Sequence, residues 1–176
     1  MATLTLYLSN ATDTLIREDI DVWIDKYAKK YKLEPALVHA ICLQESQKKF
    51  AAIRVEPHLK TKGWYLQEIP KYYRKDPYAY CSMGVMQVLF GVARHNGYRG
   101  RPFDLIRPKN SIRFGCKILS NLIDKHYYLD KVVSSYNQGS PRMKYVTVRG
   151  KRKKVFRNQD YVDSVMEFYK KLGGKY

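Results

Sequence analysis

A single acidic side chain at the end of an apolar segment is the most informative chemical feature of this sequence. Glu45 lies near the end of the segment Pro35–Ser46, in which most residues are apolar. Apolar surroundings raise the pKa of a carboxylic acid, which can then protonate the leaving oxygen when a glycosidic bond breaks. Taken alone, however, a glutamate near a helix end is usually a solvated surface residue.

Three further polar residues strengthen this interpretation. Gln87 lies in an otherwise apolar stretch, where its neutral amide must find hydrogen-bond partners. Tyr136 and Asn137 end a predicted helix shortly before Gly139, where side chains can line a cleft. Each also has a simpler explanation: Gln87 as a cap, Tyr136 as part of the core and Asn137 as a helix C-cap. Their combination with Glu45 favours cleavage of a sugar bond by one carboxylic acid.

At these residues the sequence resembles the lytic transglycosylases of the soluble, goose-type-lysozyme-like group, including phage and mobile-element members. The family pattern is an apolar helix ending in Glu-Ser, then Gly-Leu-Met-Gln, then Ala-Tyr-Asn and a closing Tyr-Val helix. The matching positions, in the same order, are Glu45-Ser46, Gly84-Val85-Met86-Gln87, Ser135-Tyr136-Asn137 and Tyr161-Val162. The resemblance covers roughly residues 33–172 and departs from the pattern mildly, at Val85 and Ser135.

The resemblance implies a mainly α, lysozyme-like (α+β) fold and cleavage of the β-1,4 bond between N-acetylmuramic acid and N-acetylglucosamine in peptidoglycan. It implies that Glu45 first acts as the general acid and then as the base on the 6-hydroxyl, which closes a 1,6-anhydro ring. Tyr136 would hydrogen-bond and orient Glu45. No cofactor and no metal are expected. The expected substrate-binding residues are Glu56, Ser82, Met86, Gln87, Tyr136 and Asn137.

Glu56 raises an alternative reaction. It lies in Arg54-Val55-Glu56-Pro57-His58, which resembles the Arg-Tyr-Glu-Pro of some phage and mobile-element members. Glu56 is either a solvated or Arg54-paired loop residue, or it positions a water opposite Glu45, as in a hydrolytic goose-type-like lysozyme. The same long segment carries tyrosines that either stack on sugars or pack on their own core, namely Tyr65, Tyr72, Tyr73, Tyr78 and Tyr80.

The charge of the chain predicts an anionic partner. Lys and Arg number 33 against 16 Asp and Glu, a formal net charge of +17, and residues 142–157 hold eight basic residues and no acidic one. We expect this patch to bind an anionic cell-wall or outer-membrane surface through Lys151, Arg152, Lys153 and Lys154. A basic nucleic-acid-binding protein is the alternative from another class, but no recognised motif supports specific nucleic-acid binding. A structural protein with a spent active site is a further alternative.

The periodicity of apolar residues predicts the elements that must position these side chains. Helices are expected at residues 16–31, 35–47, 89–95, 108–126, 129–136 and 161–172, with a short one near 69–73 and a basic β-hairpin at 145–156. Thr12–Thr14 and Asn158 are candidate N-caps. We expect one domain, 1–176, with an N-terminal helix in 1–32 and the catalytic core in 33–172.

The remaining expectations concern the cell. No apolar run approaches the ~20 residues of a membrane helix, and the first residues lack the features of a secretory signal. We therefore expect a monomer made in the cytoplasm that reaches the cell wall after release or delivery, as a phage endolysin or virion-associated muralytic enzyme would. The three cysteines are Cys42, Cys81 and Cys116, an odd number that favours reduced, buried thiols.

Overall fold

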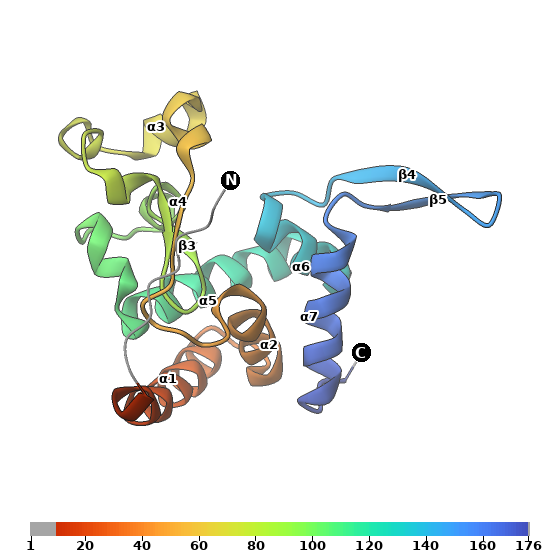
Figure 1. The fold of residues 1–176 in the computed structure, drawn as a ribbon, viewed down its shortest axis with the longest axis horizontal. Helices are drawn as coiled ribbons and strands as arrows, with labels where there is room; N and C mark the ends of the chain where they lie inside the picture. The colour runs from red at the N-terminus through yellow and green to blue at the C-terminus, as the bar shows by residue number, and fades with distance from the viewer. Residues whose placement is uncertain (1–9, 176) are drawn as a thin grey trace.

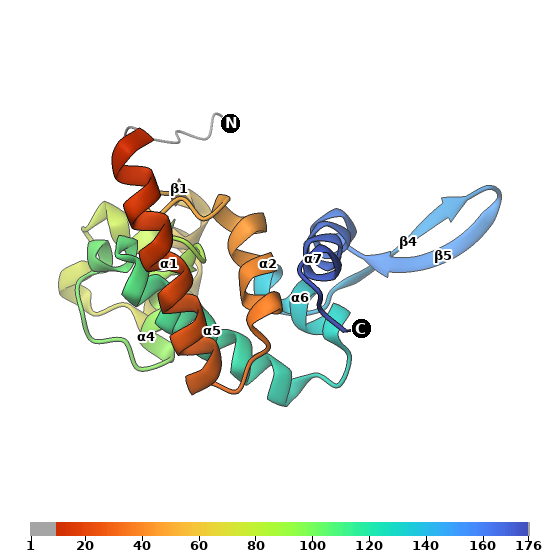
Figure 2. The same cartoon turned by 90° about the horizontal axis from the view of Figure 1, so that it is seen from below.

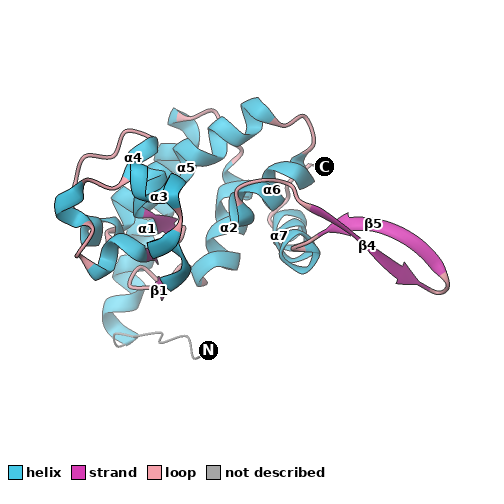
Figure 3. Cartoon of the chain, turned by 90° about the horizontal axis from the view of Figure 1, so that it is seen from above, coloured by secondary structure: helices cyan, strands magenta, loops and turns pink. Residues whose placement is uncertain are grey.

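The protein has a mainly helical fold with two small antiparallel sheets (Figures 1 and 3), and the computed structural model describes residues 10–175. The α-helices are α1 (Asn10–Lys30), α2 (Pro35–Ser46), α3 (Gly63–Glu68), α4 (Phe90–His95), α5 (Pro108–Lys125), α6 (Leu129–Gln138) and α7 (Gln159–Lys171). The strands are β1 (Ile53–Val55), β2 (Cys81–Met83), β3 (Val88–Leu89), β4 (Met143–Val148) and β5 (Lys151–Phe156). Short 3₁₀ helices cover Pro57–Thr61, Lys71–Tyr73, Pro77–Tyr80 and Pro102–Ile106. The expected mainly α, lysozyme-like fold is confirmed.

The core forms where α5 packs against α1 and α6, and where α2 packs against α7 (Figure 2). The apolar side chains of α5 recur at helical spacing, and Ile112, Cys116 and Leu119 are fully buried. Gly115 lies on the same helix against Met86, and a Cβ atom there would come 2.4 Å from Met86 Sδ. The missing side chain therefore lets the turn that carries Met86 pack directly on α5.

The sheet β1-β2-β3 contacts α4 and α5 through β3 and carries part of the site. Its antiparallel register pairs Arg54 with Ser82 and Ser82 with Leu89, so these three residues share one face of the sheet. Ile53 and Met83 pair on the opposite face, where Met83 is fully buried. The strands are only two or three residues long, and this sheet was not predicted from the sequence.

The hairpin β4–β5 projects away from the helical body (Figures 1 and 3). Its strands pair in register from Met143 with Phe156 to Val148 with Lys151. Arg149 and Gly150 form the turn with φ values of +49° and +74°, the backbone that a two-residue type I′ hairpin requires. The predicted basic hairpin is confirmed, and it begins two residues earlier than expected.

The other predicted elements match the structure with a few corrections. Thr12–Thr14 lie inside α1, which begins at Asn10, so the predicted N-cap there is wrong. Asn158 occupies the N-cap position of α7, but its side chain makes no capping hydrogen bond. Within residues 10–175, no helix is long and apolar enough to cross a membrane. The three cysteines are buried and not joined in disulfides.

Candidate active site

Glu45 lies in the last turn of α2 and faces a cleft that it shares with side chains from β1, β2, β3 and α6. Its Oε1 accepts a hydrogen bond of 2.7 Å from the Tyr161 hydroxyl of α7. The α2–α7 contact is reinforced nearby by Ser164 Oγ, which donates to Gln44 Oε1. The carboxyl group is therefore held at a fixed position by the packing of two helices that lie far apart in the sequence.

The surroundings of Glu45 favour its protonated form. Burial raises the pKa of the Glu45 carboxyl above its ordinary value, and the nearby negative charge of Glu56 raises it further. The hydrogen bond from Tyr161 and the positive charge of Arg54 act in the opposite direction. Burial prevails, so the pKa is raised overall, as a proton donor working near neutral pH requires.

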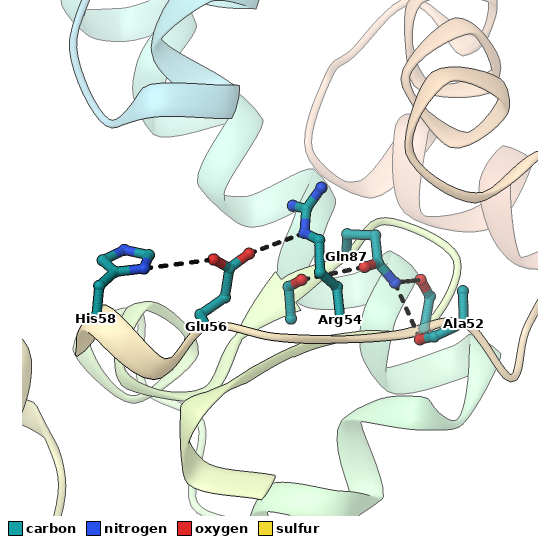
Figure 4. A network of polar contacts seen from close by, with 7 residues as sticks. Ala52, Arg54, Glu56, His58 and Gln87 are labelled. Atoms are coloured by element: carbon teal, nitrogen blue, oxygen red, sulfur yellow. Dashed lines mark hydrogen bonds and ion pairs between the residues drawn. The ribbon is translucent and has the colours of Figure 1, made fainter. Parts of the chain in front are cut away.

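A second carboxylate lines the same cleft. Glu56 follows β1, and its Oε1 accepts a hydrogen bond of 2.8 Å from Arg54 Nε, while Oε2 lies 3.6 Å from His58 Nδ1. Figure 4 shows the three side chains in a row along this segment. The predicted alternative of an ion pair between Arg54 and Glu56 is confirmed. The pairing does not remove Glu56 from the cleft, because all three residues line it.

Hydrogen bonds of the Gln87 side chain stabilise the turn between β2 and β3 (Figure 4). Its Nε2 donates to the carbonyl oxygens of Ala52 and Gly84, and its Oε1 accepts from Ser82 Oγ at 3.0 Å. The backbone of Gln87 has φ of +47°, a left-handed conformation that a non-glycine residue adopts only when its surroundings enforce it. Gln87 and Ser82, both expected to bind substrate, line the cleft, yet the Gln87 amide nitrogen already donates two hydrogen bonds within the protein.

Met86 lies behind the cleft and does not line it. Its side chain is fully buried, its N–H donates to Ser111 Oγ, and its carbonyl oxygen accepts from the Tyr136 hydroxyl at 2.9 Å. This arrangement differs from the expected sugar contact at Met86, because its side chain and both its backbone groups are occupied. It also corrects the expected partner of Tyr136, which holds the turn and not Glu45.

The end of α6 contributes Tyr136 and Asn137 to the cleft. Asn137 is not a C-cap, because α6 continues to Gln138 and ends at Gly139 with φ of +79°. Asn137 Oδ1 accepts a hydrogen bond from Asn158 Nδ2, which also donates to the carbonyl oxygen of Ser134. Asn158 therefore joins α6 to the start of α7, which explains why its side chain does not cap α7.

Two residues of the site were missed by the sequence analysis. Tyr161 was noted as part of the closing helix, but its contact with Glu45 joins positions 116 residues apart, which no local pattern gives. Arg54 was noted as a possible partner of Glu56 and not as a neighbour of Glu45. The signal for Arg54 was the i, i+2 spacing to Glu56, which places two side chains on one side of an extended segment.

Nothing in the described part of the chain gathers three or more His, Cys, Asp or Glu side chains into a group that could hold a metal ion. The side chains that line the cleft provide two carboxyl groups, one arginine, one histidine and neutral hydroxyl and amide groups. A partly enclosed acid with a raised pKa beside neutral polar groups can carry out proton transfer to and from a bound polyhydroxylated substrate.

A comparison with family profiles identifies a relationship that covers most of the chain. Residues 22–158 match the profile of the family described as transglycosylase SLT domain. The match covers most of the chain and includes Glu45, Gln87 and Tyr136. Searches of curated proteins and of solved structures gave no significant match.

Proposed function

Because the chain belongs to the transglycosylase SLT family, whose members act on peptidoglycan, we propose that it cleaves the β-1,4 bond between N-acetylmuramic acid and N-acetylglucosamine with Glu45 as the acid and base. The observation that carries this proposal is the position of the Glu45 carboxyl, which lines the cleft and is held there by the Tyr161 hydroxyl in surroundings that raise its pKa. The substrate places the site of action at the bacterial cell wall.

In the first step, the protonated Glu45 carboxyl gives its proton to the bridging oxygen. The bond between that oxygen and C1 of N-acetylmuramic acid breaks, and the electron pair leaves with the oxygen of N-acetylglucosamine. The acetamido group of the substrate can stabilise the positive charge that develops at C1, so no second catalytic carboxylate is needed. Tyr161 supports this step, because its hydroxyl fixes the carboxyl group and still permits the raised pKa.

In the second step, the Glu45 carboxylate takes the proton of the 6-hydroxyl of the same sugar. The oxygen of that hydroxyl forms a bond to C1, which closes the 1,6-anhydro ring and returns Glu45 to its acid form. Hydrogen bonds from Tyr136 and Gln87 stabilise the turn between β2 and β3, and Gln87 of this turn faces the cleft. The turn would hold the sugar against Glu45 during both steps.

Hydrolysis is the second candidate reaction, and the position of Glu56 favours it. Glu56 lines the same cleft as Glu45, and its charge acts on the pKa of Glu45. A carboxylate on the far side of C1 could activate a water, which would then attack in place of the 6-hydroxyl. The ion pair with Arg54 opposes this role, because the Arg54 guanidinium already occupies one oxygen of the Glu56 carboxylate.

Mass spectrometry of the fragments released from purified peptidoglycan tests both reactions. We expect products ending in 1,6-anhydromuramic acid from the wild type and from Glu56→Gln. Glu45→Gln should form the same products about a thousandfold more slowly. The Gln side chain keeps an acceptor for Tyr161, so the variant isolates the missing proton. Reducing-end products one water heavier, lost in Glu56→Gln, would establish the hydrolytic enzyme. Equal activity of Glu45→Gln and the wild type would refute the role of Glu45.

The basic hairpin supports a second part of the proposal, namely that β4–β5 attracts the enzyme to its anionic substrate. Six cationic residues and no acidic one lie in residues 143–156, and all six are exposed. Lys151, Lys153 and Lys154 make no ion pair among the described residues, and Arg152 lies over the Tyr145 ring at 4.1 Å. Their charges therefore remain available to an anionic polymer. A small basic protein of this kind would suit a phage or mobile-element lytic function.

A further inference from the structure

The cleft around Glu45 continues into a longer groove. The hollow next to it shares six lining residues with the cleft, His58, Leu89, Val92, Ile118, Tyr136 and Asn137. A third hollow continues from there to Arg142, at the base of the hairpin, and shares Trp64 and Gln138 with the second. A polymer bound at Glu45 can therefore extend past Tyr136 along α3, α4 and the end of α6.

Trp64 is an exposed aromatic side chain on the wall of this groove. Its exposed fraction is 55%, although the neighbouring Tyr65 is completely buried. Large apolar side chains left exposed in a concave surface mark binding sites. Among the tyrosines of the same segment, Tyr65 and Tyr80 are buried, which supports core packing for these two. Trp64, in contrast, lines the groove.

The backbone that carries Trp64 is firmly anchored. The Tyr65 hydroxyl donates to the Ala79 carbonyl oxygen at 2.8 Å and accepts from the Gly91 N–H at 3.1 Å. The Tyr65 ring lies so close to Gly91 that a Cβ atom there would come 2.6 Å from it. The rings of Trp64 and Tyr65 meet edge to face, with 5.4 Å between their centroids. The backbone position of Trp64 is therefore fixed by Tyr65, which lowers the conformational entropy that would be lost on binding.

Amide side chains line the same part of the groove with unused polar atoms. Asn121 Nδ2 donates to Asn96 Oδ1, Gln138 Nε2 donates to Ser134 Oγ, and Asn137 Oδ1 accepts from Asn158. The other amide atom of Asn121, Gln138 and Asn137 has no hydrogen-bond partner in the part of the chain that the structure describes. Neutral donors and acceptors beside an aromatic face match a sugar ring, which has hydroxyl and acetamido groups around an apolar C–H face.

We propose that Trp64 stacks on a sugar ring of the glycan strand beyond the bond to be cut, and that Asn121 and Gln138 bind the polar groups of that sugar. This inference rests on the proposed function, because it extends the same strand along the groove. Trp64 would then act as a specificity-determining residue, giving the enzyme a preference for long glycan strands over short ones.

Tryptophan fluorescence tests the contact directly. The chain has only two tryptophans, so Trp64→Phe leaves Trp23 of α1 as the only tryptophan, which is excited selectively over the tyrosines at long wavelength. Glu45→Gln protein is titrated with peptide-free octasaccharide and tetrasaccharide strands of alternating N-acetylglucosamine and N-acetylmuramic acid. We expect the octasaccharide to change the emission of Glu45→Gln protein and not that of the Glu45→Gln, Trp64→Phe protein. An emission change that survives Trp64→Phe, or no change at all, would overturn the proposal.

Turnover provides the second measurement. Trp64→Ala should lower kcat/KM for the octasaccharide by about tenfold and leave the tetrasaccharide almost unaffected, while Trp64→Phe keeps most of the preference. The matched control is Tyr72→Ala, an aromatic side chain of the same segment that is 74% exposed and does not line the groove. Thermal unfolding of each variant confirms that it is folded.

The outcomes separate this inference from the proposed function. An equal loss on both strands, or the same behaviour as Tyr72→Ala, would refute a length-specific role for Trp64 while the wild type remains active. If the wild type cleaves neither strand, the proposed function fails, and the fluorescence titration still decides whether Trp64 binds the glycan.

Discussion

Two regions of this protein carry charged and polar side chains in opposite surroundings, the cleft around Glu45 and the hairpin β4–β5. In the cleft, the positions of the central polar side chains are set by specific hydrogen bonds, such as that of Tyr161 to Glu45 and that of Tyr136 to the Met86 carbonyl oxygen. In the hairpin, the cations point into water and pack against little beyond their own strands. The first arrangement depends on the identity and position of single atoms, and the second on the number of charges.

The difference shows how one small chain can place catalysis in one region and electrostatic binding of the substrate in another. A buried carboxyl is sensitive to hydrogen bonds over a few ångströms and is poorly screened by salt, whereas exposed cations act over about 10 Å and are weakened by salt. Substitutions in the cleft should therefore change catalysis and stability, and substitutions in the hairpin should change the ionic strength at which the enzyme holds its substrate.

A matched pair of glycines should give the largest contrast between the two regions. Gly84 and Gly150 both have φ of +74°, but a Cβ atom on Gly84 would lie 2.7 Å from the Leu105 carbonyl oxygen, while one on Gly150 meets nothing within 4 Å. Gly150→Ala should therefore cost only backbone strain, about 1–2 kcal/mol at most. Gly84→Ala adds overpacking, for a total of roughly 2–5 kcal/mol, and should also displace Gln87 from the cleft.

Urea unfolding followed by circular dichroism measures both free energies of unfolding, and peptidoglycan cleavage measures the effect on the site. Equal destabilisation by the two substitutions would show that the left-handed backbone alone sets the cost, and that the surroundings of Gly84 add nothing.

The sequence predicted the parts of the fold that rest on local patterns. The helix α5 was predicted at residues 108–126 and found at Pro108–Lys125, because its apolar residues keep one helical period from Ile112 to Ile123. The hairpin was predicted from weak alternation around Arg149-Gly150. The sheet β1-β2-β3 was missed because strands of two or three residues are too short to show alternation, and β1 pairs with a strand that follows it only after a long segment, as Ile53 does with Met83.

The candidate site was predicted as a set of residues and not as a set of contacts. Glu45, Glu56, Ser82, Gln87, Tyr136 and Asn137 do line one cleft. The roles within the set could not be inferred from one sequence, because Tyr136 and Tyr161 are both tyrosines near a helix end and only packing decides which one reaches Glu45. The catalytic roles themselves remain predictions.

The hairpin should have an intermediate effect that depends on salt. Replacing four of its cations by glutamine should weaken binding to purified peptidoglycan sacculi by about tenfold at low ionic strength, with a shallower dependence on salt, because fewer counterions are exchanged on binding. Co-sedimentation at several salt concentrations measures both effects. The residues to be replaced are Lys151, Arg152, Lys153 and Lys154.

The control removes the same number of charges from exposed lysines elsewhere on the molecule. The residues of this control are Lys29, Lys62, Lys71 and Lys75. If both variants lose binding equally, net charge and not the hairpin attracts the enzyme. A gel shift with random duplex DNA at ~150 mM salt separates wall binding from nucleic-acid binding, since binding that is purely electrostatic weakens steeply with salt.

The smallest expected effect distinguishes Tyr136, which lines the cleft, from Tyr161, which contacts Glu45, through the pH dependence of cleavage. The hydrogen bond from Tyr161 lowers the pKa of Glu45, so Tyr161→Phe should raise that pKa further. Because the acid form is lost as the pH rises, the alkaline limb of the pH profile of kcat/KM should move to higher pH, while the rate at the optimum falls about two- to tenfold. Tyr136→Phe removes a bond to Met86 instead, so it should lower the thermal unfolding midpoint and leave the limb in place. A limb that moves with Tyr136→Phe and not with Tyr161→Phe would mean that Tyr136 is the residue that tunes the acid.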